Sequence, residues 1–555
     1  MKILFFLIIL LSILFYGVVG KDKTWILAPC IMINHLFIFI WLFKNFFKNK
    51  KLSFNDNNTN FLLTKDLILW FIFLIFSIIL YFSSSIQFES KKEVFYLSAV
   101  LGGYYFWRNS LSKFKYKTTF LGIFLTIIML LALYGIVIHF KYPDTILWTT
   151  RYTDHYLGRL CSTYICPNHF AHLLQMLLPF CICYLFIPKG SFYLKCICIY
   201  SFIVFLFALF LTESRAGWLG AIASISVILC AFSLLKSKRL FFSILLVIPI
   251  LISLLFIFSW NYSETFQRRM MPVVTYLQDQ NIGNKGSDSK DFRPQTWNDT
   301  INMISDKPLV GFGPGTYEYT FQKYRESFLG ERIITGHPHN EYLELIADYG
   351  IIGFILFSLS WIYTLFLLVK SSIHHKKLKY KFMSIASLGM MIGTMIHSFF
   401  DFQMHIFPNA ATFSFLLALG FKDSEANIIS KINFNRKAFL IFVLGSLMML
   451  ILCIQLNVSS LLLSLSKKYY SNNASSNALA RKYALISFNV DNGNWESIKN
   501  VGFHYSNIRY YSLFEKEKLI NAQNELEYFK SAQKLNPYDA EIYVGLAKPL
   551  IFLGK

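Results

Sequence analysis

The chain has 555 residues, of which 55% are hydrophobic and 15% are charged, and its formal net charge is +22. Ordinary soluble domains are about a quarter charged, so this composition excludes one. Apolar runs of about 18 to 25 residues recur along the chain, and each is long enough to cross a bilayer. The runs are continuous rather than alternating, which excludes a β-barrel. The basic residues gather in alternate loops, which indicates membrane orientation rather than nucleic-acid binding.

The sequence therefore predicts an all-α, polytopic membrane protein with about 12–13 transmembrane helices. The first apolar run, 3–20, follows a single Lys2 and lacks a clear small-residue cleavage site, so we interpret it as an uncleaved span. The other predicted spans lie near 25–43, 66–84, 93–107, 119–139, 168–187, 193–211, 216–235, 240–260, 341–369, 382–400, 408–421 and 438–464.

The distribution of lysine and arginine predicts the orientation of these spans. With the N-terminus in the cytoplasm, the loops that should be cytoplasmic are the basic ones, from Lys44–Lys51 and Arg108–Lys117 to Lys422–Lys437. This orientation places the large 261–340 loop and the C-terminal tail outside the cytoplasm. Because no ATP is present on that side, any chemistry there needs a substrate that is already activated.

Four parts of the chain are expected. They are N-terminal transmembrane helices over 1–140, a transmembrane core over 141–424 that includes the 261–340 loop, a last transmembrane helix over 425–464, and a helical tail over 465–555. The tail contains two helix starts, at Asn489–Trp495 and Asn536–Tyr543, that resemble fragments of tetratricopeptide repeats, although their spacing exceeds the usual ~34 residues. A surface that binds a protein partner and an accessory hairpin without a partner are equally compatible with this tail.

The nine cysteines lie mostly within apolar runs, where they act as small hydrophobic residues. No Cys-x-x-Cys pair is present, which argues against a zinc ribbon or a redox motif. Cys161 and Cys166 share one predicted outward loop, where the compartment would permit a disulfide.

Three arginines stand on the predicted outward face, at the ends of spans or in the loop: Arg159, Arg215 and Arg293. An arginine near hydrocarbon is costly unless it reaches the interface or finds a partner. Its guanidinium is also the side chain that best grips phosphate oxygens with two parallel hydrogen bonds. One such arginine alone is equally well explained as a lipid-headgroup anchor, but three on one face beside a histidine pair predict a site for an anionic substrate.

That histidine pair lies in the segment His337-Pro338-His339-Asn340. Pro338 disfavours a helical conformation at His337, so we expect a turn there and a helix start near Asn340. Both imidazoles would then lie at the partly positive N-terminus of a membrane helix, where His337 or His339 is a candidate general base. Asn340 would orient an imidazole or cap the helix. A single His-x-His is a weak metal signal, so no metal and no cofactor are expected.

Two further groups of residues lie near this segment. His397, Asp401 and His405 are spaced i, i+4, i+8 and would share one face if their helix runs that far. We interpret them as a hydrogen-bonded lining of the site rather than as metal ligands. The Gly311–Gly315 cluster lacks the Lys-Ser/Thr ending of a nucleotide-binding loop and is interpreted as a compact turn that seats the loop against the spans.

These motifs together resemble the O-antigen ligase superfamily, which also contains O-antigen polymerases of the Wzy type and bacterial protein O-oligosaccharyltransferases. The resemblance covers roughly residues 150–420. It rests on Arg293, Trp297, Pro308 to Tyr317, His337 to Leu343 and Tyr349-Gly350, with support from Arg159, Pro167-Asn168, Ser214 to Gly217, His397-Ser398, Asp401-Phe402 and Pro408.

The resemblance implies a metal-independent glycosyltransferase in the bacterial inner membrane that depends on a polyprenyl diphosphate. It would move a glycan from an undecaprenyl-diphosphate carrier to an acceptor hydroxyl on the extracytoplasmic face, most often that of lipid A-core. Arg159, Arg215 and Arg293 would neutralise the diphosphate, and His337 or His339 would take the proton. The supporting residues would be Asn168, Asn340, His397 and Asp401.

Other functions stay open. A polysaccharide polymerase would use a growing glycan as acceptor, and a protein O-oligosaccharyltransferase would use a protein, for which the tail would be a docking surface. From a different class, a flippase or transporter of lipid-linked glycans also needs many spans and polar residues near the membrane. A transporter would place charges at the midplane and show duplicated halves, whereas here the charges gather at the outward ends, which favours the transferase. A scaffold built around the tail is the least favoured function.

Overall fold

We analysed the chain in a computed structural model, which describes residues 1–555 apart from 17–26, 49–63, 112–113, 143–144, 148, 151–155, much of 238–291, 327–334, 422–435, 471–473 and 555. Within the described ranges the protein is built almost entirely of helices. The exception is a small antiparallel hairpin of β1 (Thr145–Ile146) and β2 (Thr149–Thr150). The predicted span 240–260 and most of 261–291 lie outside the described residues.

Twelve helices of the described chain coincide with twelve of the predicted spans. They are α1 (Lys2–Phe15), α2 (Leu27–Lys48), α3 (Lys65–Ser83), α4 (Gln87–Ser110), α5 (Phe114–Lys141), α6 (Pro167–Leu185), α7 (Phe192–Leu211), α8 (Arg215–Lys236), α13 (Glu341–His374), α14 (Leu378–His397), α15 (Phe407–Leu419) and α16 (Arg436–Tyr469). Six of them, α3, α5, α7, α8, α13 and α16, are long and apolar enough to cross a membrane. The all-α polytopic class is therefore confirmed, while the number of crossings stays a prediction.

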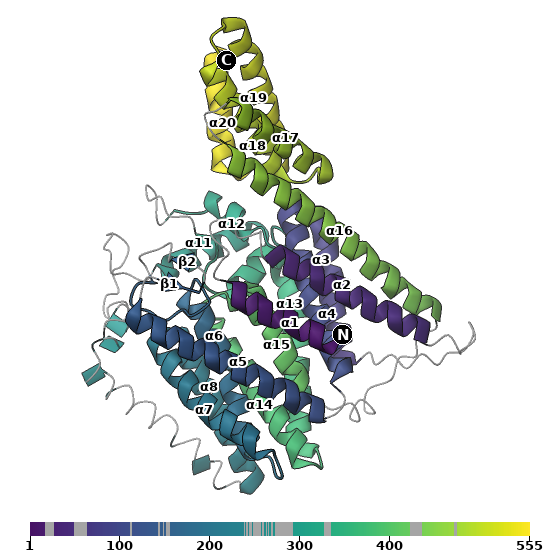
Figure 1. The fold of residues 1–555 in the computed structure, drawn as a ribbon, viewed down its shortest axis with the longest axis vertical. Coiled ribbons are helices and arrows are strands. Elements are labelled where there is room, and N and C mark those ends of the chain that lie inside the picture. Colours follow the sequence, from purple (N-terminus) through teal and green to yellow (C-terminus); the bar gives the residue numbers. More distant parts are fainter. Residues whose placement is uncertain are drawn as a thin grey trace.

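Short elements cover one end of this bundle, and we call that end the site face. Figure 1 shows there the β1–β2 hairpin together with α11 (Arg293–Asp306) and α12 (Tyr317–Thr320). Two 3-10 turns complete the set, η3 (Phe321–Lys323) and η4 (Gln403–His405). The C-terminal helices project from the same end (Figure 1). The C-terminal helices and the described residues 292–326 thus lie at one end of the bundle, while the orientation of that end across the membrane stays a prediction.

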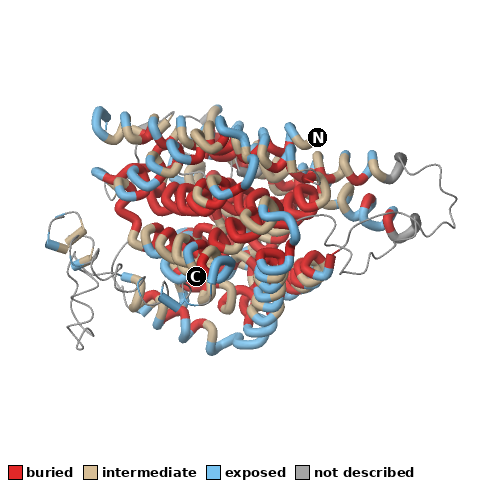
Figure 2. The backbone as a smooth tube through the Cα atoms, turned by 90° about the horizontal axis from the view of Figure 1, so that it is seen from below, coloured by how far each residue is buried: buried red, intermediate tan, exposed pale blue. Residues whose placement is uncertain are grey.

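The centre of the bundle is formed by α6 and α15, which are buried on nearly all sides. A helix that is apolar all round belongs in such a core, and Figure 2 shows the inner helices as the buried ones, with exposed residues at the outside. α6 packs against α7, α8 and α14, and α15 packs against α4 and α1. Proline occupies the first turn of both α6 and α15, where its missing N–H costs nothing. Their N-terminal ends carry much of the site.

The glycine-rich segment is a compact turn against a kink in α13, as predicted. Gly350 breaks the helical path of α13 with φ +66°, a conformation that suits glycine. The backbone N–H groups of Phe312 and Gly313 donate to the carbonyls of Ala347 and Asp348 at 3.0 and 2.9 Å. The Asp348 carboxylate accepts a further bond from the Gly315 N–H at 2.7 Å. The turn therefore satisfies backbone groups that the kink leaves open.

Four helices follow α16 in the tail: α17 (Ala474–Val490), α18 (Trp495–Tyr511), α19 (Glu515–Leu535) and α20 (Ala540–Phe552). Side chains of Asn494 and Asp539 cap α18 and α20, which agrees with the two helix starts expected from the sequence. Phe529 and Trp495 are buried in the core of this C-terminal unit. Its relation to tetratricopeptide repeats and the division of the chain into four parts stay predictions.

Candidate functional site

His339 and Asp401, which are 62 residues apart in the sequence, form a hydrogen-bonded pair on the site face. His339 Nδ1 lies 2.9 Å from Asp401 Oδ1, and the Asp401 side chain is fully buried. His339 has φ +53°, which is uncommon for a residue other than glycine and costs of order 1–3 kcal/mol. The turn thus holds this imidazole against the carboxylate in a strained conformation, as is frequent at functional sites.

Asp401 connects the imidazole to one of the predicted arginines. Asn168, at the start of α6, donates from Nδ2 to Asp401 Oδ2 at 2.6 Å. The other end of the same amide, Oδ1, accepts from Arg159 Nη2 at 2.6 Å. Arg159 also donates from Nε to the carbonyl of Thr212 at 2.8 Å. Four predicted residues therefore form one chain, Arg159–Asn168–Asp401–His339.

The other two arginines open helices at the edges of this chain. Arg215 is the first residue of α8, after Ser214, whose side chain caps the helix by accepting from the Gly217 N–H. Arg215 lies three residues after Thr212, whose carbonyl accepts the hydrogen bond from Arg159. Arg293 is the first residue of α11, as predicted, and its charge acts on Asp401.

The charges around Asp401 keep it ionised. Burial raises the pKa of this carboxyl, but the neighbouring His339, and then His169 and Arg293, lower it by more, so that it lies well below its usual range. The Phe402 N–H also donates to Asp401 Oδ1, at 3.0 Å. Asp401 is therefore an acceptor of hydrogen bonds only.

Asn340 serves as a helix cap. Its side-chain oxygen accepts from the N–H groups of Tyr342 and Leu343 at the start of α13, at 3.0 and 3.2 Å. Of the two roles expected for Asn340, the structure shows capping. The turn before it is tied to α11, because Trp297 Nε1 donates to the carbonyl of Pro338 at 2.9 Å. Arg293 and His339 are thus positioned by elements that contact each other.

His337 belongs to a different cluster from His339. Its Nδ1 lies 2.7 Å from Glu344 Oε1, and its ring stacks on Phe402 with centroids 4.0 Å apart. His405 lies between Glu341 and Glu344, with nitrogen–oxygen distances of 3.2 and 3.5 Å. Burial lowers the pKa of His405, but these two carboxylates raise it by more, to well above its usual value.

This second cluster offers the atoms of a metal site. Ligand atoms of His337, Glu344 and His405 all lie within 4.8 Å of one another. Two imidazoles and a carboxylate are ligands that Zn²⁺ accepts. The expectation that the protein uses no metal therefore stays a prediction.

The expected helical face of His397, Asp401 and His405 is wrong. α14 ends at His397, and Asp401 and His405 lie in the following loop and in η4. His397 points instead to the core, where its Nδ1 lies 2.7 Å from Gln175 Oε1. Cys161 and Cys166 are not joined to each other, so the disulfide permitted by their compartment is not formed.

Sequence reasoning missed the carboxylates at the start of α13. Glu341 and Glu344 follow Asn340 directly, and Glu344 is buried. A buried acid within an apolar helix is costly unless paired, so the two glutamates in this run were a usable signal. Glu93 of α4 lines the same cavity as Glu344 and His405.

That cavity, of about 430 Å³, lies between α3, α4, α13 and α15. One end is acidic, with Glu93, Glu341 and Glu344, and the remainder is apolar, with Trp70 and Phe357 among its walls. Carboxylates repel a diphosphate, so an anionic group is expected on the arginine side of Asp401 rather than here.

Part of the chain is similar to known proteins. Residues 200–358, which include Arg215, Arg293, His337 and His339, match a family model described as O-antigen ligase. A Haemophilus influenzae protein named "Uncharacterized protein" is 25% identical over 215 residues, which cover 37% of this chain and 52% of that protein. A Rickettsia conorii protein named "Putative polysaccharide ligase" is 29% identical over 165 residues, which cover 28% of this chain and 36% of that protein.

The chain thus spans about half the length of the first relative, 52%, and a smaller part of the second. The family match covers α7, α8, α11, α12 and the first half of α13, whereas Arg159, Asn168 and Asp401 lie outside it. The predicted resemblance is confirmed over residues 200–358: this part of the polytopic membrane protein matches the O-antigen ligase family model and contains two of the three arginines and both histidines of the His337–Asn340 turn.

Proposed function

We propose that the protein is a membrane glycosyltransferase of the O-antigen ligase kind, which moves a glycan from an undecaprenyl-diphosphate carrier to an acceptor hydroxyl. The observation that carries this proposal is the hydrogen-bonded chain from Arg159 through Asn168 and Asp401 to His339. It joins a group suited to phosphate with a group suited to proton transfer, which are the two requirements of this reaction.

His339 is the proposed general base. Asp401 is ionised and can only accept, so the Nδ1 of His339 must carry the proton that they share. The Nε2 of the same ring then keeps its lone pair and can take a proton from a hydroxyl. This is the tautomer control that a buried aspartate exerts on a catalytic histidine. His337 faces Glu344 and His405 instead.

The three arginines are the proposed binding site of the diphosphate. Arg159, Arg215 and Arg293 each stand at or beside the N-terminal end of a helix, where the helix dipole adds to their positive charge. The charge of the leaving diphosphate grows as the bond to the sugar breaks. Fixed cations in a partly buried site therefore stabilise the transition state more than the bound donor.

The proposed step balances as follows. The acceptor oxygen attacks the anomeric carbon of the glycan and forms the new glycosidic bond, while the bond between that carbon and the diphosphate oxygen breaks. The electron pair of the broken bond stays with undecaprenyl diphosphate, which leaves between the arginines. The acceptor proton moves to Nε2 of His339. No metal or cofactor is required in this scheme, because the arginines take the place of a metal at the diphosphate.

Ligation to lipid A-core is the leading acceptor assignment. The predicted orientation places the site face outside the cytoplasm of the bacterial inner membrane, with the N-terminus inside and the tail in the periplasm. The alternative acceptors are a growing glycan and a protein hydroxyl. The C-terminal unit lies on the site face and is available there to hold a partner that presents an acceptor (Figure 1).

Glycan transfer in vesicles tests the proposal. Vesicles that contain the protein, undecaprenyl-diphosphate-linked glycan and lipid A-core are expected to yield capped lipid A-core with the wild type. His339→Ala and Arg215→Ala are expected to lose about 10²- to 10⁴-fold in rate at matched protein levels. His374→Ala is the matched control, because His374 ends α13 far along the chain from the site and is expected to leave transfer unchanged.

The product distinguishes the candidate functions. Longer glycan chains without capped lipid would assign a polymerase, and a labelled protein would assign an O-oligosaccharyltransferase. Full activity of both site variants would refute the proposed site. Movement of the lipid carrier across the bilayer without any transfer by the wild type would refute the enzyme and assign a flippase.

A further inference from the structure

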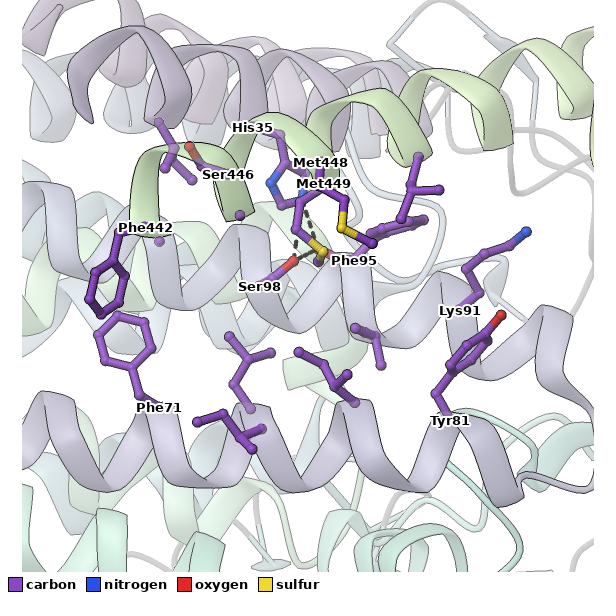
Figure 3. Close-up of a pocket in the computed structure, with 18 of the residues that line it drawn as sticks. His35, Phe71, Tyr81, Lys91, Phe95, Ser98, Phe442, Ser446, Met448 and Met449 are labelled. Atoms are coloured by element: carbon purple, nitrogen blue, oxygen red, sulfur yellow. Dashed lines mark hydrogen bonds between the residues drawn. The ribbon is translucent and has the colours of Figure 1, made fainter. Parts of the chain in front are cut away.

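A second and larger cavity, of about 960 Å³, lies between α2, α3, α4 and α16. Its walls are mostly apolar, and Figure 3 shows His35, Ser98, Met448 and Met449 close together between its two ends. Methionine side chains are flexible and adapt to irregular hydrocarbon shapes. None of the residues that form the candidate site lines this cavity.

The helix α4 separates this cavity from the site. One side of α4 lines the large cavity with Val94, Phe95, Ser98, Gly102 and Tyr105. The opposite side lines the smaller cavity that reaches Glu344 and His405, and the residues there include Tyr96, Val100 and Tyr104. The two cavities therefore have separate linings, and an occupant of the large one would not touch the reacting groups.

The two ends of the large cavity differ in polarity. At one end the rings of Phe71 and Phe442 face each other, with centroids 6.2 Å apart (Figure 3). At the other end Lys91 and Tyr81 stand close together, and Lys91 forms an ion pair with Asp491, which lies in the turn between α17 and α18 of the C-terminal unit. The cavity is thus apolar along its length and charged at the end nearest the site face.

The side of the cavity between α3 and α16 opens toward the membrane. Ile75 of α3 and Met448 of α16 both line the cavity and are exposed by 56% and 62%. Both helices are long and apolar enough to cross a membrane, so in the bilayer these side chains meet hydrocarbon rather than water. A lipid chain can enter from the side without leaving the apolar phase.

From these observations we propose that the large cavity binds a zwitterionic glycerophospholipid, with one acyl chain between α3 and α16 and its headgroup at Lys91 and Asp491. The paired charges of the headgroup match the paired charges of the protein. The phosphate would pair with the ammonium of Lys91, and the headgroup ammonium would pair with the carboxylate of Asp491. An anionic lipid such as phosphatidylglycerol would satisfy Lys91 with its phosphate but offers no ammonium to Asp491, so its net negative charge would lie beside that carboxylate.

The lipid would act as a structural ligand. α16 packs mainly on α2 and α17, and α3 packs mainly on α4 and α13. An acyl chain between α3 and α16 would therefore add to the contact that Phe71 and Phe442 make between these two helices. The headgroup would also join α4 to the C-terminal unit, because Lys91 and Asp491 belong to these two parts.

Native mass spectrometry of the purified full chain tests the inference, with phosphatidylethanolamine and phosphatidylglycerol of identical acyl chains as probes. The delipidated wild type is expected to retain one phosphatidylethanolamine. Gly445→Phe is expected to lose it. Gly445 lines the cavity, and a Cβ added there has no neighbouring atom within 4 Å, so the new ring would occupy the space of the lipid. Leu444→Phe is the matched control, since Leu444 is the neighbouring residue, is exposed and does not line the cavity.

A second variant guards against misfolding. Ser446→Phe also places a ring in the cavity and is expected to lose the lipid while its melting temperature shows a folded protein. The double variant Lys91→Gln/Asp491→Asn is expected to remove the preference for phosphatidylethanolamine over phosphatidylglycerol.

Three results would overturn the inference. They are equal retention of phosphatidylethanolamine by the wild type and both ring variants, equal or stronger retention of phosphatidylglycerol by the wild type, and displacement of the phospholipid by undecaprenyl phosphate. None of these measurements depends on glycan transfer, so they test the lipid site independently of the proposed function.

Discussion

Trp495, the first residue of α18, donates a hydrogen bond from Nε1 to the carboxylate of Glu89 in the first turn of α4, at 3.0 Å. The same carboxylate accepts from Lys92 at 2.9 Å. The ring of Tyr319, which follows the glycine-rich turn, packs edge-on against the Trp495 ring with centroids 5.1 Å apart. The C-terminal unit is therefore fixed to the bundle at α4 and to the segment that carries the site loop.

Removal of the Trp495 side chain is expected to detach the C-terminal unit. Trp495→Ala deletes a buried ring and leaves the Glu89 carboxylate without its indole partner, at a cost of about 3–5 kcal/mol. Hydrogen exchange of the full chain should then show faster exchange over 474–552. Tyr510→Ala is the control, because Tyr510 is 79% exposed, and it should leave exchange unchanged. Wild-type protection in the Trp495 variant would show that other contacts hold the unit.

Substitution of Asp401 by asparagine is expected to impair catalysis rather than donor binding. The asparagine amide can donate to Nδ1 of His339 and so stabilise the tautomer that has no lone pair on Nε2. The expected result is a fall in kcat of about 10²- to 10⁴-fold with KM nearly unchanged. Steady-state kinetics with the lipid-linked donor measure both constants. The control is Asp306→Asn at the exposed end of α11, and an unchanged kcat for Asp401→Asn would rule out the dyad.

The kink in α13 is expected to require glycine. A Cβ at Gly350 would lie 2.2 Å from the backbone of Leu309, and its φ of +66° strains any other residue. Gly350→Ala should therefore cost about 2–4 kcal/mol and separate the glycine-rich turn from α13. A thermal melt in detergent measures the loss. Gly445→Ala should instead melt at or slightly above the wild-type temperature, because its Cβ meets no atom within 4 Å.

The stability of the C-terminal unit is expected to depend on pH through His504. Burial, and then the charge of Arg481, lowers the pKa of this imidazole from 6.5 to about 4. As pH falls, the unfolded chain binds a proton at His504 before the folded chain does. The contribution of His504 to stability is therefore fully present above about pH 6.5 and is lost between about pH 6.5 and pH 4. The loss approaches ~3 kcal/mol at the lower limit.

Hydrogen exchange of α17 and α18 between pH 7 and pH 4.5, corrected for the intrinsic rate, measures this dependence. His504→Gln retains a polar side chain that can bond Ser466 or Asn477, the partners of the imidazole, but it does not titrate. A variant with the same pH dependence as the wild type would show that another group is responsible.

The parts of the structure that follow from local physics could be predicted from the sequence. Hydropathy identified the twelve spans that the described helices match, and local rules placed the start of α11 at Arg293 and the cap of α13 at Asn340. The pairing of His339 with Asp401 could not be predicted, because it depends on how α6, α13 and the loop after α14 meet in space. The predicted shared helix face of His397 and Asp401 fails because α14 ends at His397. Asp401 lies in the loop that follows, where it contacts the His339 imidazole.

The fixed attachment of the C-terminal unit also has a practical consequence for imaging. A polytopic protein in a detergent micelle offers few features by which single particles can be aligned, because the micelle hides most of its mass. Here four helices project beyond the bundle as a continuation of α16 and are held at Glu89, so that they protrude in one direction (Figure 1). This unit gives electron microscopy a built-in fiducial marker, and an antibody fragment raised against its outer helices would enlarge that marker without touching the site.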